Sequence, residues 1–98
     1  MWRMDRDAAR LLLESQHKFP SDHRFHVIVR AEELAITSVS AAIAAHCRLE
    51  SLGAREERVP SSKGTYLSLR LSLPCENADA VLDVYALLAS LPGVIRYF

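Results

Sequence analysis

The stretch Thr65-Tyr66-Leu67-Ser68-Leu69-Arg70-Leu71-Ser72-Leu73 alternates apolar and polar residues along most of its length. Successive side chains of a β-strand point to opposite faces, so this alternation predicts a strand with one buried and one exposed face. The four leucines and Thr65 would form the buried face, and each leucine would contribute about 1.5–3 kcal/mol of transfer free energy. Tyr66 and Arg70 would then lie on the opposite face.

Patterns on both sides of this strand predict further strands and helices. Period-two alternation and β-branched residues indicate strands, whereas apolar residues at helical spacing indicate helices. Asn77 is a residue type that caps helix N-termini, and the Pro92-Gly93 pair ends the helix that follows it. The expected elements are strands at about 24–30, 54–59, 65–73 and 94–98, and helices at 33–47 and 77–91.

The order strand, helix, strand, strand, helix, strand predicts an α+β fold of the ferredoxin-like βαββαβ class. The right-handed crossover rule places both helices on one face of a four-stranded antiparallel sheet and leaves the other face open. Residues 19–98 would form this single domain. Residues 1–18 would form a helical appendage that is capped by Asp5 or Asp7 and carries Ala8, Leu11, Leu12 and Ser15.

The composition narrows the class of protein. The chain has 98 residues, and 12 basic residues balance 12 acidic ones. Zero net charge argues against a nucleic-acid backbone as the main partner, although it permits a local basic patch. Two cysteines without metal-ligand spacing, no apolar run long enough to span a membrane and no signal-peptide pattern predict a cytoplasmic protein.

The segment Pro60-Ser61-Ser62-Lys63-Gly64 connects two expected strands and permits two interpretations. In the first, the serines form side-chain turns, the glycine takes a positive φ and the lysine keeps the tip hydrated. In the second, backbone N–H groups, two hydroxyls and an ammonium form a site for an anion or a partner backbone. Lysine before glycine and the lack of a following helix exclude a P-loop.

The open sheet face is the second candidate surface. Strand alternation places His26, Arg30, Tyr66, Arg70 and Arg96 on it, together with Phe98. RNA-recognition modules have the same element order and stack bases on this face. However, Thr65 and Leu67 occupy the positions of the stacking aromatics, and Tyr66 is one residue out of phase. A protein contact therefore suits the face better, because Arg, Tyr and Phe are enriched at interfaces.

Metal binding and catalysis find little support in the sequence. The spacing of His17, His23 and His26 matches no zinc signature, and the last two would point to opposite faces. Ser62, Cys47 and Cys75 are nucleophile types without an activating motif. A domain this small also has little room for a pocket of about 300 Å³. We therefore expect no metal, no cofactor and no catalytic residue.

Four features together resemble the YbeD-like family of small bacterial proteins of uncharacterised function. They are Phe19-Pro20, His46, the Pro60–Gly64 loop followed by tyrosine, and Tyr85. The resemblance spans about residues 13–98 and implies a ferredoxin-like fold similar to the ACT regulatory domains. Val29-Arg30-Ala31 stands where ligand-binding ACT domains carry a glycine, which argues against amino-acid sensing by the ACT mechanism.

These observations predict a small non-catalytic regulatory or adaptor domain. It would bind a partner protein or a small ligand through the 60–64 loop and the open sheet face. A single-stranded RNA-binding module that uses the same face is the alternative. The two edges of such a sheet expose backbone groups, which also allows a homodimer.

Overall fold

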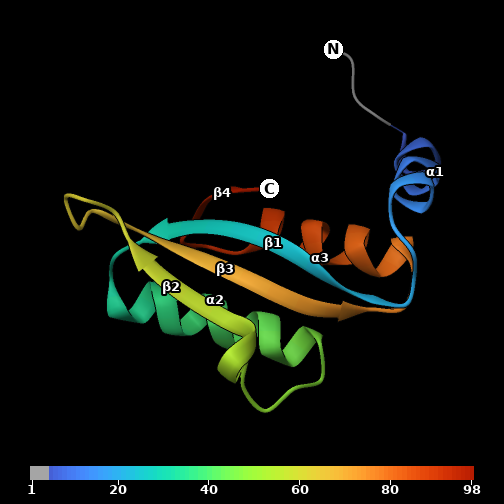
Figure 1. Ribbon diagram of the computed structural model, residues 1–98. Helices are drawn as coiled ribbons and strands as arrows, with labels where there is room; N and C mark the ends of the chain where they lie inside the picture. Colours follow the sequence, from blue (N-terminus) through green and yellow to red (C-terminus); the bar gives the residue numbers. More distant parts are fainter. Residues whose placement is uncertain (1–4) are drawn as a thin grey trace.

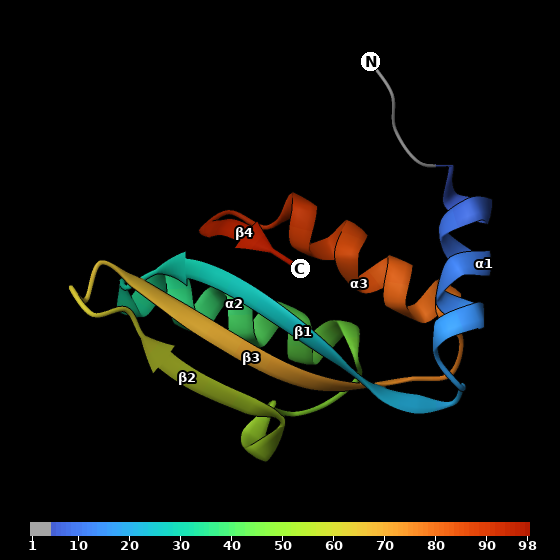
Figure 2. The ribbon, with the colours of Figure 1, turned by 45° about the horizontal axis from the view of Figure 1, so that its top comes forward.

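The computed structural model describes residues 5–98 and has the α+β fold that the sequence predicts (Figure 1). Four antiparallel strands form one sheet, α2 and α3 cover one face of it, and α1 lies beside the end of α3 (Figures 1 and 2). The elements are α1 (Arg6–Gln16), β1 (Ser21–Arg30), α2 (Glu33–His46), the short 3-10 helix η1 (Gly53–Arg55), β2 (Glu56–Pro60), β3 (Tyr66–Cys75), α3 (Ala78–Ser90) and β4 (Val94–Tyr97).

The strand order is β2-β3-β1-β4, so β1 and β3 are the two central strands. They pair over ten residues, with Phe25 opposite Leu71 and Val27 opposite Leu69. All four leucines of β3 are buried, and Leu69 and Leu73 are fully enclosed. The predicted phase of β3 is therefore confirmed. The core is completed from the helices by Ile36, Val39, Ile43, Val81, Val84 and Leu88.

The boundaries differ from the prediction at several strand ends. β1 begins three residues earlier than expected, because the segment from Ser21 continues to pair with the last part of β3. β2 begins at Glu56 rather than Ala54, since residues 53–55 form η1, in which Gly53 has φ +51°. The predicted cap of α3 is confirmed, because the Asn77 side chain accepts a hydrogen bond from the Ala80 N–H.

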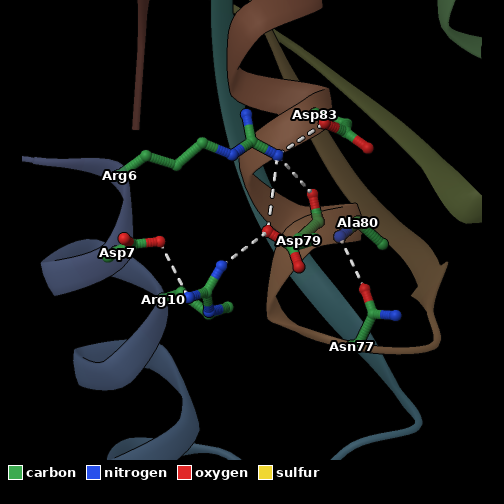
Figure 3. A network of polar contacts seen from close by, with 7 residues as sticks. All are labelled: Arg6, Asp7, Arg10, Asn77, Asp79, Ala80 and Asp83. Carbon is green, nitrogen blue, oxygen red and sulfur yellow. Dashed lines mark hydrogen bonds and ion pairs between the residues drawn. The ribbon is translucent and has the colours of Figure 1, made fainter.

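Helix α1 contacts α3, and ion pairs connect the two helices (Figure 3). Arg6 lies 2.7 Å from Asp83 and 3.6 Å from Asp79, and Arg10 lies 3.7 Å from Asp79. Asp5 stands at the N-cap position, as one alternative predicted, but its side chain makes no capping bond. The leucines expected to mark the helix are not its contact with the domain: Leu11 and Leu12 are exposed, and Leu13 packs against the core.

These ion pairs are half-exposed, so each is expected to contribute at most about 1 kcal/mol and to weaken with salt. We predict that the double variant Arg6→Gln/Arg10→Gln leaves the domain's free energy of unfolding within about 1 kcal/mol of the wild type. Amide hydrogen exchange in α1 should rise several-fold, because local opening no longer breaks the pairs. The control is Lys18→Gln, an exposed cation beyond the end of α1 that takes part in none of these pairs. Unchanged exchange in α1 would show that apolar contacts alone hold the helix.

No helix within residues 5–98 combines the length and the apolar character needed to cross a membrane.

Candidate ligand-binding face

One row of side chains crosses the whole open face of the sheet. Glu57 of β2 is opposite Arg70 of β3, and Arg70 is opposite His26 of β1. His26 and Phe98 exchange both backbone hydrogen bonds, at 2.7 and 2.8 Å, which extends the row beyond β4. Directly opposite residues on one face have Cβ atoms about 4.5–5.5 Å apart. The register therefore places a carboxylate, a guanidinium group, an imidazole and a phenyl ring side by side.

The second row lies one step along the strands, where Arg24 of β1 is opposite Ser72 of β3. Arg55 of η1 reaches over the same position, because its guanidinium donates to the Ser72 carbonyl oxygen at 3.3 Å. The 3-10 turn η1 before β2 thus supplies one wall of the face, and Phe98 supplies the opposite one.

The two rows line a depression of about 530 Å³ on the open face. This volume corrects the expectation that the domain has little room for a pocket. The prediction rested on the small size of the domain, but a twisted sheet with an uncovered face can be hollowed on its outside. The lining residues are Arg24, Phe25, His26, Ala54, Arg55, Glu57, Arg70, Leu71, Ser72 and Phe98.

The depression is positively charged. Arg55 lies 3.2 Å from Asp22 and Arg70 lies 3.5 Å from Glu57, so each of these guanidinium groups has a carboxylate partner. Arg24 forms no ion pair and donates no hydrogen bond to any residue between Asp5 and Phe98. As far as residues 5–98 are concerned, the Arg24 guanidinium group is therefore free to meet a negative charge.

The open face is basic as a whole although the chain has zero net charge. Five arginines lie on it or at its rim, against the carboxylates of Asp22 and Glu57. The balancing acids stand elsewhere, for example Asp79 and Asp83 on α3. The arginines are Arg24, Arg30, Arg55, Arg70 and Arg96.

His26 carries an unsatisfied polar atom at the centre of the long row. Its Nε2 is shielded from solvent and has no hydrogen-bond partner within the described part of the chain. The ring packs against Phe98 with the two ring centroids 4.6 Å apart. An unpaired buried polar atom is unfavourable by about 1–3 kcal/mol, so a group that reached this nitrogen would gain a hydrogen bond.

The five residues predicted for the face all have the register that the alternation requires. His26 and Arg70 meet in the depression, whereas Arg30 is opposite Tyr66 near the hairpin and Arg96 is opposite Ile28. Arg30, Tyr66 and Arg96 do not line the depression. The sequence reasoning overlooked two arginines that do line it. Arg24 shares the parity of His26 and could have been found, but Arg55 is placed by a 3-10 turn that no periodicity signals.

The hairpin loop projects from the end of the sheet away from α1 (Figure 1). The Gly64 N–H donates to the Ser61 carbonyl oxygen at 3.0 Å, and the Tyr66 N–H donates to Ser61 Oγ at 3.1 Å. Gly64 has φ +71°, in the region that favours glycine. Ser61 and Gly64 therefore have structural roles in the turn, while Ser62 and Lys63 are exposed at its tip and Pro60 is the last residue of β2.

The two thiols are in environments that favour the protonated form. Burial, with smaller contributions from Cys47 and Asp22, raises the pKa of Cys75 to about 11. Burial also raises the pKa of Cys47, against a smaller lowering by Arg55. Since the thiolate is the nucleophile, neither cysteine is activated at neutral pH.

Two histidines lie together on the helix side of the sheet. The rings of His17 and His23 are edge-on with centroids 4.9 Å apart, while His26 is on the open face. Burial, and then the charge of His17, lowers the pKa of His23. Across residues 5–98, no group of three or more His, Cys, Asp or Glu side chains is arranged to hold a metal ion.

The comparisons with known proteins identify a family but no activity. The family described as protein of unknown function, DUF493, matches residues 14–98, which is the whole domain without most of α1. The chain belongs to this family. Comparison with curated proteins and with solved structures finds no significant match.

Proposed function

We propose that this DUF493 protein is a non-catalytic regulatory or adaptor domain that binds a ligand or a partner on its open sheet face. The observation that carries the proposal is the basic depression of about 530 Å³ on a face that no helix covers. Ligand pockets have volumes of about 300–1,000 Å³ and combine apolar walls with a few convergent polar groups. The depression has both, because the exposed Phe98 and Ala54 line it beside the arginines.

A binding role is supported over catalysis by the chemistry of the available nucleophiles. The raised pKa values of Cys47 and Cys75 disfavour their thiolates. Ser62 is exposed at the hairpin tip, whereas His23 and His26 pair with Leu73 and Arg70, four or more residues beyond the hairpin end of β3. A serine nucleophile requires an adjacent general base.

The resemblance to the YbeD-like family is compatible with this role. We propose, in addition, that the protein is related to the YbeD-like proteins and to the ACT regulatory domains. We also propose that it is cytoplasmic. The 60–64 loop is retained as a second contact, for which the exposed Ser62 and Lys63 are the available groups.

Nuclear magnetic resonance tests the proposal without a known ligand. A panel of neutral, cationic and anionic metabolites is added to the ¹⁵N-labelled protein, and amide shifts are mapped. We expect the hits to shift Arg24, His26, Arg70 and Ser72, because these residues surround the depression.

Two matched variants separate the depression from the loop. Arg70→Gln should weaken the hits, and Lys63→Gln should matter only for a ligand that also reaches the hairpin. Both residues are exposed, so both variants should fold with a stability within about 0.5 kcal/mol of the wild type. Hits that map to other surfaces, or that ignore Arg70→Gln, would contradict the proposal.

The basic face also favours the second candidate, binding of single-stranded RNA. Positive charge along a sheet attracts a nucleic-acid backbone, and exposed rings such as Tyr66 and Phe98 can stack on bases. This candidate predicts binding that weakens with salt and with Arg70→Gln or Tyr66→Ala. Absence of binding to an oligouridine at low salt would exclude it.

Formation of a homodimer remains a prediction. The two edge strands of the sheet differ in how well they could pair with a second copy. The β2 edge carries Glu57 and Arg58 and ends in Pro60, features that protect edge strands from pairing. The β4 edge carries the exposed Ile95 and Tyr97. If the domain dimerises through a strand, β4 is the better edge.

A further inference from the structure

We infer that the ligand of the open face is a small organic anion whose carboxylate or phosphate group binds Arg24 and whose flat apolar part packs on Phe98. This inference rests on the proposed function, because it names the chemistry of the ligand that the depression would hold. It follows from three properties of the lining: the charge of Arg24, the unsatisfied nitrogen of His26 and the exposed ring of Phe98.

Arg24 is the anchor because no carboxylate within residues 5–98 pairs with its guanidinium group. Arg55 and Arg70 flank the same depression, but Asp22 and Glu57 already pair with them. A guanidinium group offers parallel N–H donors that match the two oxygens of a carboxylate or phosphate. An oxyanion at Arg24 would therefore gain a charge-assisted bidentate contact without displacing an existing ion pair.

The neighbouring arginines strengthen the preference for an anion. Arg24 is directly opposite Ser72, and Arg70 is its diagonal neighbour on β3, at a distance that long side chains can span. Three arginines line the depression, and among residues 5–98 Glu57 is the one acidic side chain that does so. A cationic ligand would meet net repulsion here, and a neutral ligand would leave the Arg24 charge unused.

Phe98 indicates what the rest of the ligand is. Its side chain lines the depression beside the row of His26 and Arg70, and the residue is 57% exposed. An exposed ring at the edge of a basic depression favours an apolar, flat group over a fully hydrated ion. A hydrogen-bonding group on the ligand would also satisfy the His26 Nε2 atom, which has no partner in the described chain.

Four small probes test the inference by amide-shift titration of the full chain. Benzoate and phenyl phosphate carry a ring and an anion, benzamide replaces the carboxylate with a neutral amide, and acetate lacks the ring. We expect benzoate or phenyl phosphate to shift Arg24, His26, Ser72 and Phe98. Benzamide and acetate should each bind at least about tenfold more weakly, since each loses one of the two contacts. The stronger of the first two probes distinguishes a carboxylate from a phosphate ligand.

Arg24→Gln and Arg96→Gln form the matched pair of variants. Both remove one charge from the same face, and Arg96 lies outside the depression. We expect Arg24→Gln to weaken benzoate or phenyl phosphate by about tenfold or more, and Arg96→Gln to leave either affinity within about twofold. The amide spectrum of each variant shows directly whether it remains folded.

Three kinds of outcome overturn the inference, and the first of them leaves the proposed function intact. If benzamide equals benzoate, or if the two variants have equal effects, the face binds ligands without anion selection and only this inference fails. If an oligouridine binds far more tightly than phenyl phosphate and also shifts Arg30, Tyr66 and Arg96, the occupant is a nucleic-acid strand. If no probe and no metabolite shifts the face, both proposals fail.

Discussion

Leu69→Ala is expected to lower the free energy of unfolding by about 2–5 kcal/mol, measured by chemical denaturation. Leu69 is at the middle of β3, fully enclosed, opposite Val27 of β1. Truncation removes the burial of three carbon atoms and leaves a cavity among strands and helices that cannot close around it. Domains of this size have about 5–15 kcal/mol of stability in total, so the variant is expected to lose a large share of it.

Ser68→Ala is the matched control, because it changes the adjacent residue on the other face of the same strand. Ser68 is opposite Ile28 and Val59 on the open face, and the substitution should change stability by less than about 1 kcal/mol. A large loss for Ser68→Ala together with a small loss for Leu69→Ala would show that the phase of β3 is inverted. The basic depression would then have no open face on which to form.

Gly93→Ala is expected to be the second most damaging of the small substitutions, at about 2–4 kcal/mol. Gly93 connects α3 to β4 with φ +91°, where residues with a Cβ are strained by about 1–2 kcal/mol. A Cβ at this position would also lie 3.3 Å from the Ala35 Cβ of α2, which adds a steric cost in a packed region. Because β4 follows directly, the variant should also disturb the pairing of His26 with Phe98.

Gly64→Ala separates these two costs. Gly64 has φ +71°, but a Cβ there would have no heavy atom within 4 Å. It should therefore lose only the backbone contribution, about 1–2 kcal/mol. Denaturation of the two variants under the same conditions gives the packing cost of Gly93 as the difference. Equal losses would mean that α2 yields to the added methyl group.

The sequence was sufficient for the central architecture because the relevant signals are local. Alternation in β3 fixed which residues are buried, and helical spacing at Ile36, Val39 and Ile43 identified the inner face of α2. The cap at Asn77 could likewise be predicted from the sequence, since capping depends on residues a few positions apart. Strand ends were read less well, because pairing with a neighbour extends β1 beyond its own apolar pattern.

The candidate site could be predicted only in part, because part of it depends on contacts between distant segments. His26 and Arg70 followed from strand parity, whereas the contribution of Arg55 depends on η1, a turn without a periodic signal. The zero net charge concealed the basic face, because a total does not say where charges lie. Local chemistry within the chain thus determined the strands, the helices and the two faces of the sheet. Only the tertiary structure decided which charged groups meet, since pairing between distant strands and the twist of the sheet bring Arg24, Arg55 and Arg70 around one depression.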